Sequence, residues 1–207
     1  MESEVDCMVK EKPMAKITRE SLMSLETYAR ERKVFREHVL AHKKSRSVHL
    51  GEHLTLLYED ETTIRYQIQE MLRIEKGGAA QVPDELAAYD PMVPKGSELT
   101  ATLLFEVADP VKRDAFLRTI GGVEDHIALQ VGGETIRARA EGDVERTRES
   151  DGKASAVHFV HFDFTPSAVA AWKSGEGQAM VVIDHPNYGH AALIGAEARA
   201  YLARECF

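Results

Sequence analysis

The sequence is poor in the residues and patterns by which large classes of proteins are recognised, and cysteine is the clearest case. Among its 207 residues only Cys7 and Cys206 are cysteines, and they form neither a CxxC motif nor a disulfide framework. This scarcity is typical of a reducing compartment, so we expect a cytoplasmic protein. No apolar run approaches the roughly 20 residues that a membrane span needs, and the N-terminus lacks the apolar core of a signal peptide. We therefore expect neither membrane insertion nor secretion.

Common catalytic signatures are missing as well. The patterns GxSxG, GxxxxGK[ST], GxGxxG and HExxH are absent from the sequence, which argues against the common hydrolases, P-loop proteins, dinucleotide-binding proteins and zincins. The net charge is −8, and the basic residues are spread among acidic ones. Nucleic acid is therefore not an expected partner. These patterns leave open whether the protein is an enzyme.

Hydrophobic residues make up 43% of the chain, and their spacing predicts an α+β protein. Residues 1–15 are polar and are expected to form a disordered tail. Residues 16–90 are predicted to form a helical region that also holds a short hairpin, at 47–58, and a central helix, at 62–75. Glycines and prolines then mark a boundary, after which residues 97–207 are expected to form a sheet domain.

The sheet domain is predicted to consist of two successive β-α-β-β units, at residues 98–140 and 155–194. The pattern is a resemblance in topology, because identical residues are few. We expect a mainly antiparallel sheet with the two helices packed on one face. His158 and His161 lie on opposite faces of a predicted strand, so one of them is expected to face solvent.

The predicted central helix carries polar side chains that form a candidate ligand-binding site. Its apolar residues share one face at 100° per residue. The polar candidates are Tyr66, Gln67, Gln69, Glu70 and Arg73. Gln67 projects into the apolar sector, where it could cap a buried backbone group, and the other four gather on the opposite side. That side could bind a small molecule, or it could be an ordinary solvated helix face.

Residues 184–190, Asp-His-Pro-Asn-Tyr-Gly-His, place a carboxylate, two imidazoles and a phenol in one hairpin turn. A turn needs none of these groups, and Asp184 could orient His185. The candidate metal ligands are His53, His185, His190 and Glu70. Such a set suits Fe(II), Mn(II) or Zn(II) with one position open, and Tyr188 could bind a ligand or donate a proton there. The alternative is an Asx-type turn with both histidines partly exposed.

Two motifs together resemble a known family. YQIQEMLRIE at 66–75 and DHPNYGH at 184–190 are similar to a bacterial domain-of-unknown-function family, the one numbered 3501, over about Lys16 to Leu202. The resemblance implies no activity and no catalytic residue. Members of that family tend to be encoded beside a rubrerythrin-like protein and an iron–sulfur protein. This setting implies peroxide or oxidative-stress chemistry as an association only.

Three functions remain open. The first is an accessory, partner-binding component of a redox system, whose expected partners are the rubrerythrin-like and iron–sulfur proteins. The second is a small metal-binding protein or metalloenzyme that uses His185 and His190 with a carboxylate from the central helix. The third is a small-molecule sensor whose pocket lies between the N-terminal helices and the sheet and uses Tyr66, Gln69, Glu70 and Arg73.

Overall fold

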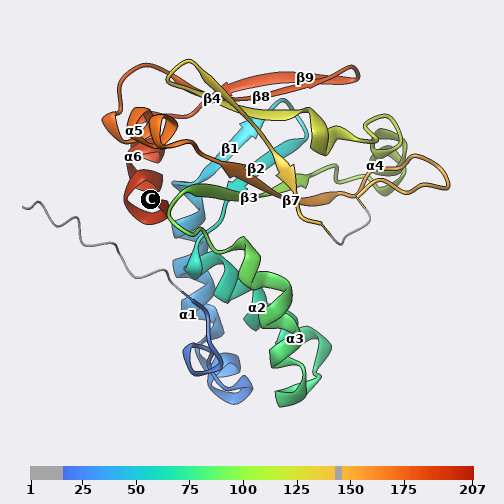
Figure 1. Cartoon of the computed structure of the whole chain (residues 1–207). Helices are drawn as coiled ribbons and strands as arrows, with labels where there is room; N and C mark the ends of the chain where they lie inside the picture. Colours follow the sequence, from blue (N-terminus) through green and yellow to red (C-terminus); the bar gives the residue numbers. More distant parts are fainter. Residues whose placement is uncertain (1–15, 143–145) are drawn as a thin grey trace, which may run out of the picture.

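The computed structural model describes residues 16–142 and 146–207, and within them the chain has the predicted α+β architecture (Figure 1). The predicted disordered tail, residues 1–15, lies outside the described residues. The described part contains six α-helices and two antiparallel sheets. None of these helices is both long and apolar enough to span a bilayer.

The elements follow in the order of the chain. The α-helices are α1 (Leu25–Lys44), α2 (Glu61–Glu75), α3 (Val82–Tyr89), α4 (Pro110–Leu117), α5 (Pro166–Ser174) and α6 (Ala196–Cys206). The strands are β1 (Ser47–Leu50), β2 (Leu54–Tyr58), β3 (Glu98–Phe105), β4 (Ile127–Val131), β5 (Glu134–Arg137), β6 (Arg139–Ala140), β7 (Val157–Asp163), β8 (Ala179–His185) and β9 (Tyr188–Leu193). Four short 3-10 helices are η1 (Arg19–Ser21), η2 (Gly78–Ala80), η3 (Asp90–Met92) and η4 (Val123–His126).

The strands form two sheets, where the sequence predicts one. Sheet A has the order β1-β2-β3-β7-β6, and sheet B has the order β5-β4-β8-β9. Each β-α-β-β unit gives its first strand to sheet A, where β3 pairs with β7, and its following hairpin to sheet B, where β4 pairs with β8. Alternation of apolar residues shows which face of a strand is buried but not which strand it pairs with, so the sequence could not distinguish one sheet from two.

The helices also differ from the expected arrangement. In Figure 1, α4 and α5 lie at opposite ends of the sheets rather than together on one face. The outer face of sheet A is covered by α2 and α3 instead, because Ile64 and Ile68 of α2 pack in a cluster that includes Phe159 of β7. The hairpin β1–β2 is hydrogen-bonded to β3, and it is therefore part of sheet A.

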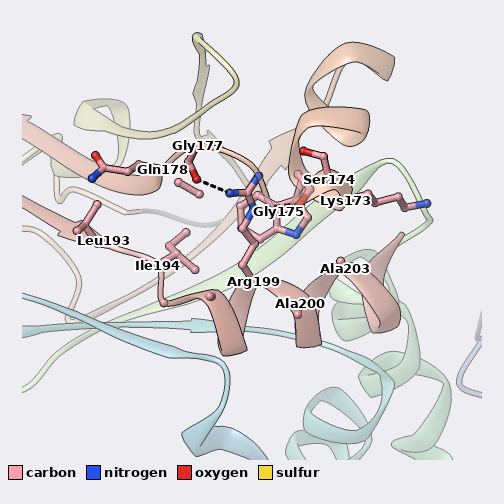
Figure 2. Close-up of a pocket in the computed structure, with 14 residues that line it drawn as sticks. Lys173, Ser174, Gly175, Gly177, Gln178, Leu193, Ile194, Arg199, Ala200 and Ala203 are labelled. Atoms are coloured by element: carbon pink, nitrogen blue, oxygen red, sulfur yellow. Dashed lines mark hydrogen bonds between the residues drawn. The ribbon is translucent and has the colours of Figure 1, made fainter.

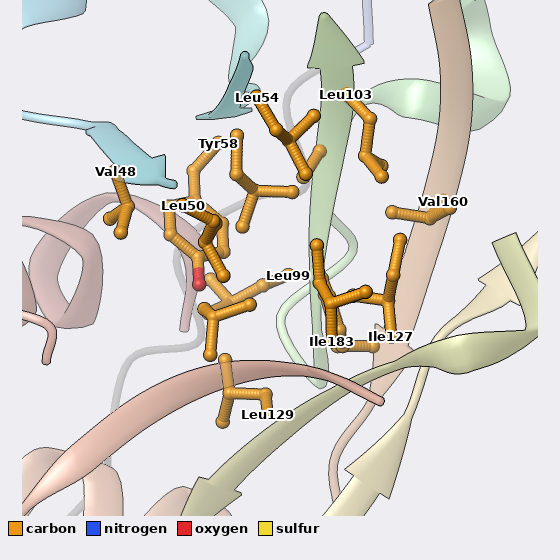
Figure 3. Packing of buried hydrophobic residues seen from close by; sticks show 14 of the residues in the cluster. Val48, Leu50, Leu54, Tyr58, Leu99, Leu103, Ile127, Leu129, Val160 and Ile183 are labelled. Atoms are coloured by element: carbon orange, nitrogen blue, oxygen red, sulfur yellow. The ribbon is translucent and has the colours of Figure 1, made fainter. Parts of the chain in front are cut away.

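The main core fills the space between the inner faces of the two sheets. Leu99 and Leu103 of β3 and Val160 of β7 meet Ile127 and Ile183 from sheet B (Figure 3). Burying one such side chain fully stabilises the fold by roughly 1.5–3 kcal/mol. This shared core joins the two β-α-β-β units into one body.

Strand β7 is buried on both faces. His158 points into the main core and His161 points to the outer face, and their exposed fractions are only 1% and 4%. The expectation that one of them faces solvent is therefore wrong. His161 lies between Glu98, 2.9 Å from Nδ1, and Glu141, 2.7 Å from Nε2. Burial lowers the pKa of His161, but the two carboxylates outweigh burial and the net pKa is raised.

Candidate functional site

Glu70, a candidate for both ligand and metal binding, lies between α1 and α2, and its carboxylate is hydrogen-bonded by side chains from both helices. Arg32 donates to its carboxylate through two nitrogens at 2.7 and 2.8 Å, and the Tyr28 hydroxyl donates at 2.5 Å. Arg73 adds a weaker contact at 3.3 Å. The bonds from Arg32 hold the pKa of Glu70 at about 2. Glu70 thus joins two helices as a fixed carboxylate.

The other candidates on α2 face the same neighbours. Gln69 is buried, and its side chain bonds both backbone groups of Met23, with the Met23 N–H donating at 2.7 Å. The ring of Tyr66 packs on Phe35 of α1 at 5.9 Å between centroids, and Gln67 is half-buried. Tyr66, Gln69 and Glu70 thus contact α1 and the segment before it, and Arg73 is exposed beside Glu70. A cavity of about 420 Å³ lies nearby, and none of the five candidates lines it.

Two of the three histidine candidates, His53 and His190, contact Tyr188 at the end of the sheets that carries α4. Tyr188 is buried there, its hydroxyl donates to the Leu50 carbonyl at 2.6 Å, and it accepts from the His53 N–H at 3.2 Å. The ring of His190 packs against Tyr188, 4.4 Å between centroids. Phe116 of α4 contacts the rings of both His53 and Tyr188, at 4.9 and 5.6 Å. We call His53, Phe105, Phe116, Tyr188 and His190 the histidine–aromatic end.

Asp184 does not orient His185, in contrast to the prediction. Consecutive strand residues point to opposite faces, and Asp184 is exposed, where it accepts from His126 Nδ1 at 3.0 Å and pairs with Arg137. His185 is buried, donates from Nε2 to the Gly121 carbonyl at 3.3 Å, and accepts the backbone N–H of Asn187 at Nδ1. Backbone groups therefore hold His185.

The predicted metal ligands are consequently not brought together as a set. Glu70 lies between α1 and α2, and both ring nitrogens of His185 are hydrogen-bonded. The described residues contain no group of three or more His, Cys, Asp or Glu side chains arranged to hold an ion. Only His53 and His190 of the four lie in the histidine–aromatic end.

A buried acid–base pair lies beneath this end. His158 packs on Phe105, and its Nε2 donates to the Ser155 carbonyl at 2.9 Å. Its Nδ1 lies 3.6 Å from Glu124 Oε2, and both of these atoms are buried without a hydrogen-bond partner in the structure. Burial lowers the pKa of His158. The carboxylate and the imidazole are thus neighbours in the core, at a distance beyond hydrogen-bonding range.

Sequence reasoning missed a second polar cluster, where α1, α2 and α6 meet. His42 Nε2 lies 2.7 Å from Asp60 Oδ2, and His42 Nδ1 lies 2.9 Å from the Tyr201 hydroxyl. The guanidinium of Arg46 is fully buried and lies 2.9 Å from the same Asp60 oxygen. His42 is separated by 18 positions from Asp60 and by 159 from Tyr201, so no local pattern could have revealed the cluster.

A cavity of about 470 Å³ lies between the C-terminal end of α5 and helix α6. Figure 2 shows Arg199 reaching from α6 to the Gly177 carbonyl at its edge, at 2.9 Å. Arg199 also donates to the carbonyls of Ala171, Trp172 and Glu176. It is buried and caps the end of α5, where the negative end of the helix dipole favours a cation. The contacts of Arg199 therefore explain its burial by a structural role.

The fold defines an α+β protein whose two antiparallel sheets pack around one main core and contain two β-α-β-β units. The histidine–aromatic end lies at one end of these sheets. The chain belongs to the family described as "Protein of unknown function (DUF3501)", whose model matches residues 16–206. Among solved structures it is similar to a novel protein of unknown function from Burkholderia pseudomallei K96243. The two chains are 44% identical with a TM-score of 0.84, and the match covers 92% of this chain and 98% of that one. The search of curated proteins gives no match.

Proposed function

We propose that this protein is a partner-binding component of a bacterial redox system and that the histidine–aromatic end is its binding surface. The observation that carries the proposal is a ring cluster from three separate parts of the chain. Phe116 contacts His53 and Tyr188, and His190 packs on Tyr188. Aromatic side chains such as Phe116 and Tyr188 are enriched in the cores of protein–protein interfaces. The redox setting and the partners, a rubrerythrin-like protein and an iron–sulfur protein, come from the family resemblance.

Exposed apolar side chains next to this end support the proposal. Val111 of α4 is 79% exposed, and Val157 at the start of β7 is 41% exposed. The backbone N–H of Ala154 donates to the Leu117 carbonyl at 2.9 Å, which places the chain entering β7 beside α4. The carboxylate of exposed Asp184, which bonds His126 and pairs with Arg137, supplies charge on the outer face of sheet B at the same end. An apolar centre with a polar border is the usual composition of a protein–protein interface.

The test is binding of the purified rubrerythrin-like and iron–sulfur proteins, measured at low salt with wild type and two variants. Val111→Asp places a charge on the proposed surface, and Val34→Asp makes the same change on α1, where Val34 is 69% exposed. We expect Val111→Asp to weaken binding by about fivefold or more, because placing a charge at an apolar interface contact costs at least about 1 kcal/mol. Val34→Asp should bind like wild type.

If the two variants bind with equal affinity, α4 is not part of the interface. If neither protein binds wild type under these conditions, the partner-binding proposal is wrong for this redox system. Both substituted side chains are exposed, so unchanged melting temperatures are expected and serve as the check on folding.

Metal binding is a second proposal, favoured by one observation. Within the described residues the rings of His53 and His190 make no hydrogen bond, and both belong to the histidine–aromatic end. Neutral imidazole nitrogens bind iron, manganese and zinc, with water completing the shell. The test is elemental analysis of tag-free protein. Near-stoichiometric metal that disappears in the His53→Ala/His190→Ala double variant would support a metalloprotein, and metal at trace level would count against it.

A further inference from the structure

The cluster of Tyr201, His42 and Asp60 has the order of groups found in nucleophilic triads: a hydroxyl, an imidazole and a carboxylate. The two links measure 2.9 Å and 2.7 Å. Tyr201 is half-buried in α6, whereas the side chains of His42 and Asp60 are only 12% and 10% exposed. Tyr201 is thus partly accessible to solvent, and the base and the orienting group are linked to its hydroxyl.

Charge and hydrogen bonding fix the proton positions in this cluster. Burial raises the pKa of Asp60, but the Arg46 charge, the Thr63 N–H and His42 outweigh burial, so the net pKa is lowered. Asp60 is therefore a carboxylate that can only accept. Nε2 of His42 then donates to this carboxylate, and the Tyr201 hydroxyl lies 2.9 Å from the other ring nitrogen, Nδ1, to which it can donate.

The surroundings hold these groups in place. Asp60 is the N-cap of α2 and accepts the Thr63 N–H at 2.9 Å, so its carboxylate is fixed by the helix start. The guanidinium groups of Arg46 and Arg204 lie 5.1 and 5.5 Å from the centre of the Tyr201 ring. Cation–π attraction at such distances favours one ring position. If the cluster served only to hold α6 against α1, the hydrogen bond between Tyr201 and His42 would be enough.

We propose that Tyr201, His42 and Asp60 form a nucleophilic site, in which the phenolic oxygen of Tyr201 attacks the acyl carbon of a small activated ester. The site is separate from the histidine–aromatic end, and it does not depend on the proposed partner.

The step balances within the three residues and the ester. The Tyr201 oxygen forms a bond to the acyl carbon while Nδ1 of His42 takes the phenolic proton. The bond between the acyl carbon and the leaving oxygen breaks, and the leaving group departs with its electron pair. The products are an acyl-tyrosine ester, the released anion and a protonated His42, which the Asp60 carboxylate stabilises. No oxidant or reductant is needed.

The experiment treats the full chain with p-nitrophenyl acetate and locates acetyl groups by peptide mass spectrometry over time. Tyr66 is the internal control, because it is also half-buried but its hydroxyl makes no hydrogen bond in the described part of the chain. General-base assistance contributes about 100-fold or more in rate. We therefore expect Tyr201 to be acetylated at least about tenfold faster than Tyr66, a cautious bound on that contribution.

Two variants complete the test. His42→Gln should reduce acetylation of Tyr201 to the rate of Tyr66 and leave Tyr66 unchanged, and Tyr201→Phe should remove the fast release of p-nitrophenolate. Acetylation of Tyr201 no faster than Tyr66 in wild type overturns the proposal. The same conclusion holds if His42→Gln folds and Tyr201 reacts as before. The wild-type comparison decides the matter even if a variant fails to fold.

Discussion

Glu70 binds three side chains at once, two from α1 and one from its own helix. Helical spacing placed it correctly beside Gln69 and on the side opposite Ile64 and Ile68. Spacing could not show that α1 covers this side, because the cover comes from a segment about 40 positions earlier in the chain, as the separation of 38 between Arg32 and Glu70 shows. The residues of the candidate site were therefore predictable as a group, and their partners were not.

Replacing Glu70 tests whether this carboxylate stabilises the fold. Glu70→Gln should lower the free energy of unfolding at pH 7 by about 2 kcal/mol, because hydrogen bonds to a charged group contribute roughly 1.5–3 kcal/mol. The pKa of Glu70 is depressed from 4.5 to about 2 in the fold, so its stabilisation is present above pH 4.5 and is lost as the pH falls towards 2. Urea unfolding of both proteins at pH 7 and pH 3 measures this.

Glu37→Gln is the matched control, because Glu37 is exposed on α1 and should change stability by less than about 0.5 kcal/mol. A difference between wild type and Glu70→Gln that stays constant between pH 7 and pH 3 would contradict the assigned role.

At the scale of elements, α6 is fixed to α5 by one buried side chain. Arg199 donates to four backbone carbonyls between Ala171 and Gly177, which lie at and just after the end of α5. The sequence predicts both helices, from the proline that begins α5 and the alternation of small and charged residues in α6. It does not predict the contact, because an arginine in a charged helix normally lies in solvent.

Arg199→Met keeps the length of the side chain but removes all of its donors. We expect the free energy of unfolding to fall by about 3 kcal/mol, since carbonyls that lose a charged donor are left without a partner. Arg36→Met, at an exposed arginine on α1, is the control and should cost less than about 0.5 kcal/mol. The measurement is urea unfolding, and equal stability of the two variants would show that water replaces the Arg199 contacts.

At the scale of the molecule, the helical and sheet regions of the described chain are joined at several places. Hairpin β1–β2 pairs with β3, α2 packs on β7 through Phe159, and Tyr201 of α6 bonds to His42 of α1. The two β-α-β-β units were recognisable from turn residues and alternation. The contacts between the helical and sheet regions were not recognisable, because they join residues that are far apart in the sequence and leave no local pattern.

These contacts predict that the helical and sheet regions unfold together. Trp172, the single tryptophan, is fully buried beside α6 and reports on the sheet region. Circular dichroism at 222 nm reports mainly on α1 and α2, the long helices of 20 and 15 residues. We expect both signals to change at the same urea concentration, since regions that share a sheet and two packing clusters open as one unit. Loss of the helical signal before the Trp172 fluorescence changes would mean that residues 25–75 unfold alone and that hairpin β1–β2 is too weakly paired to couple them to the core.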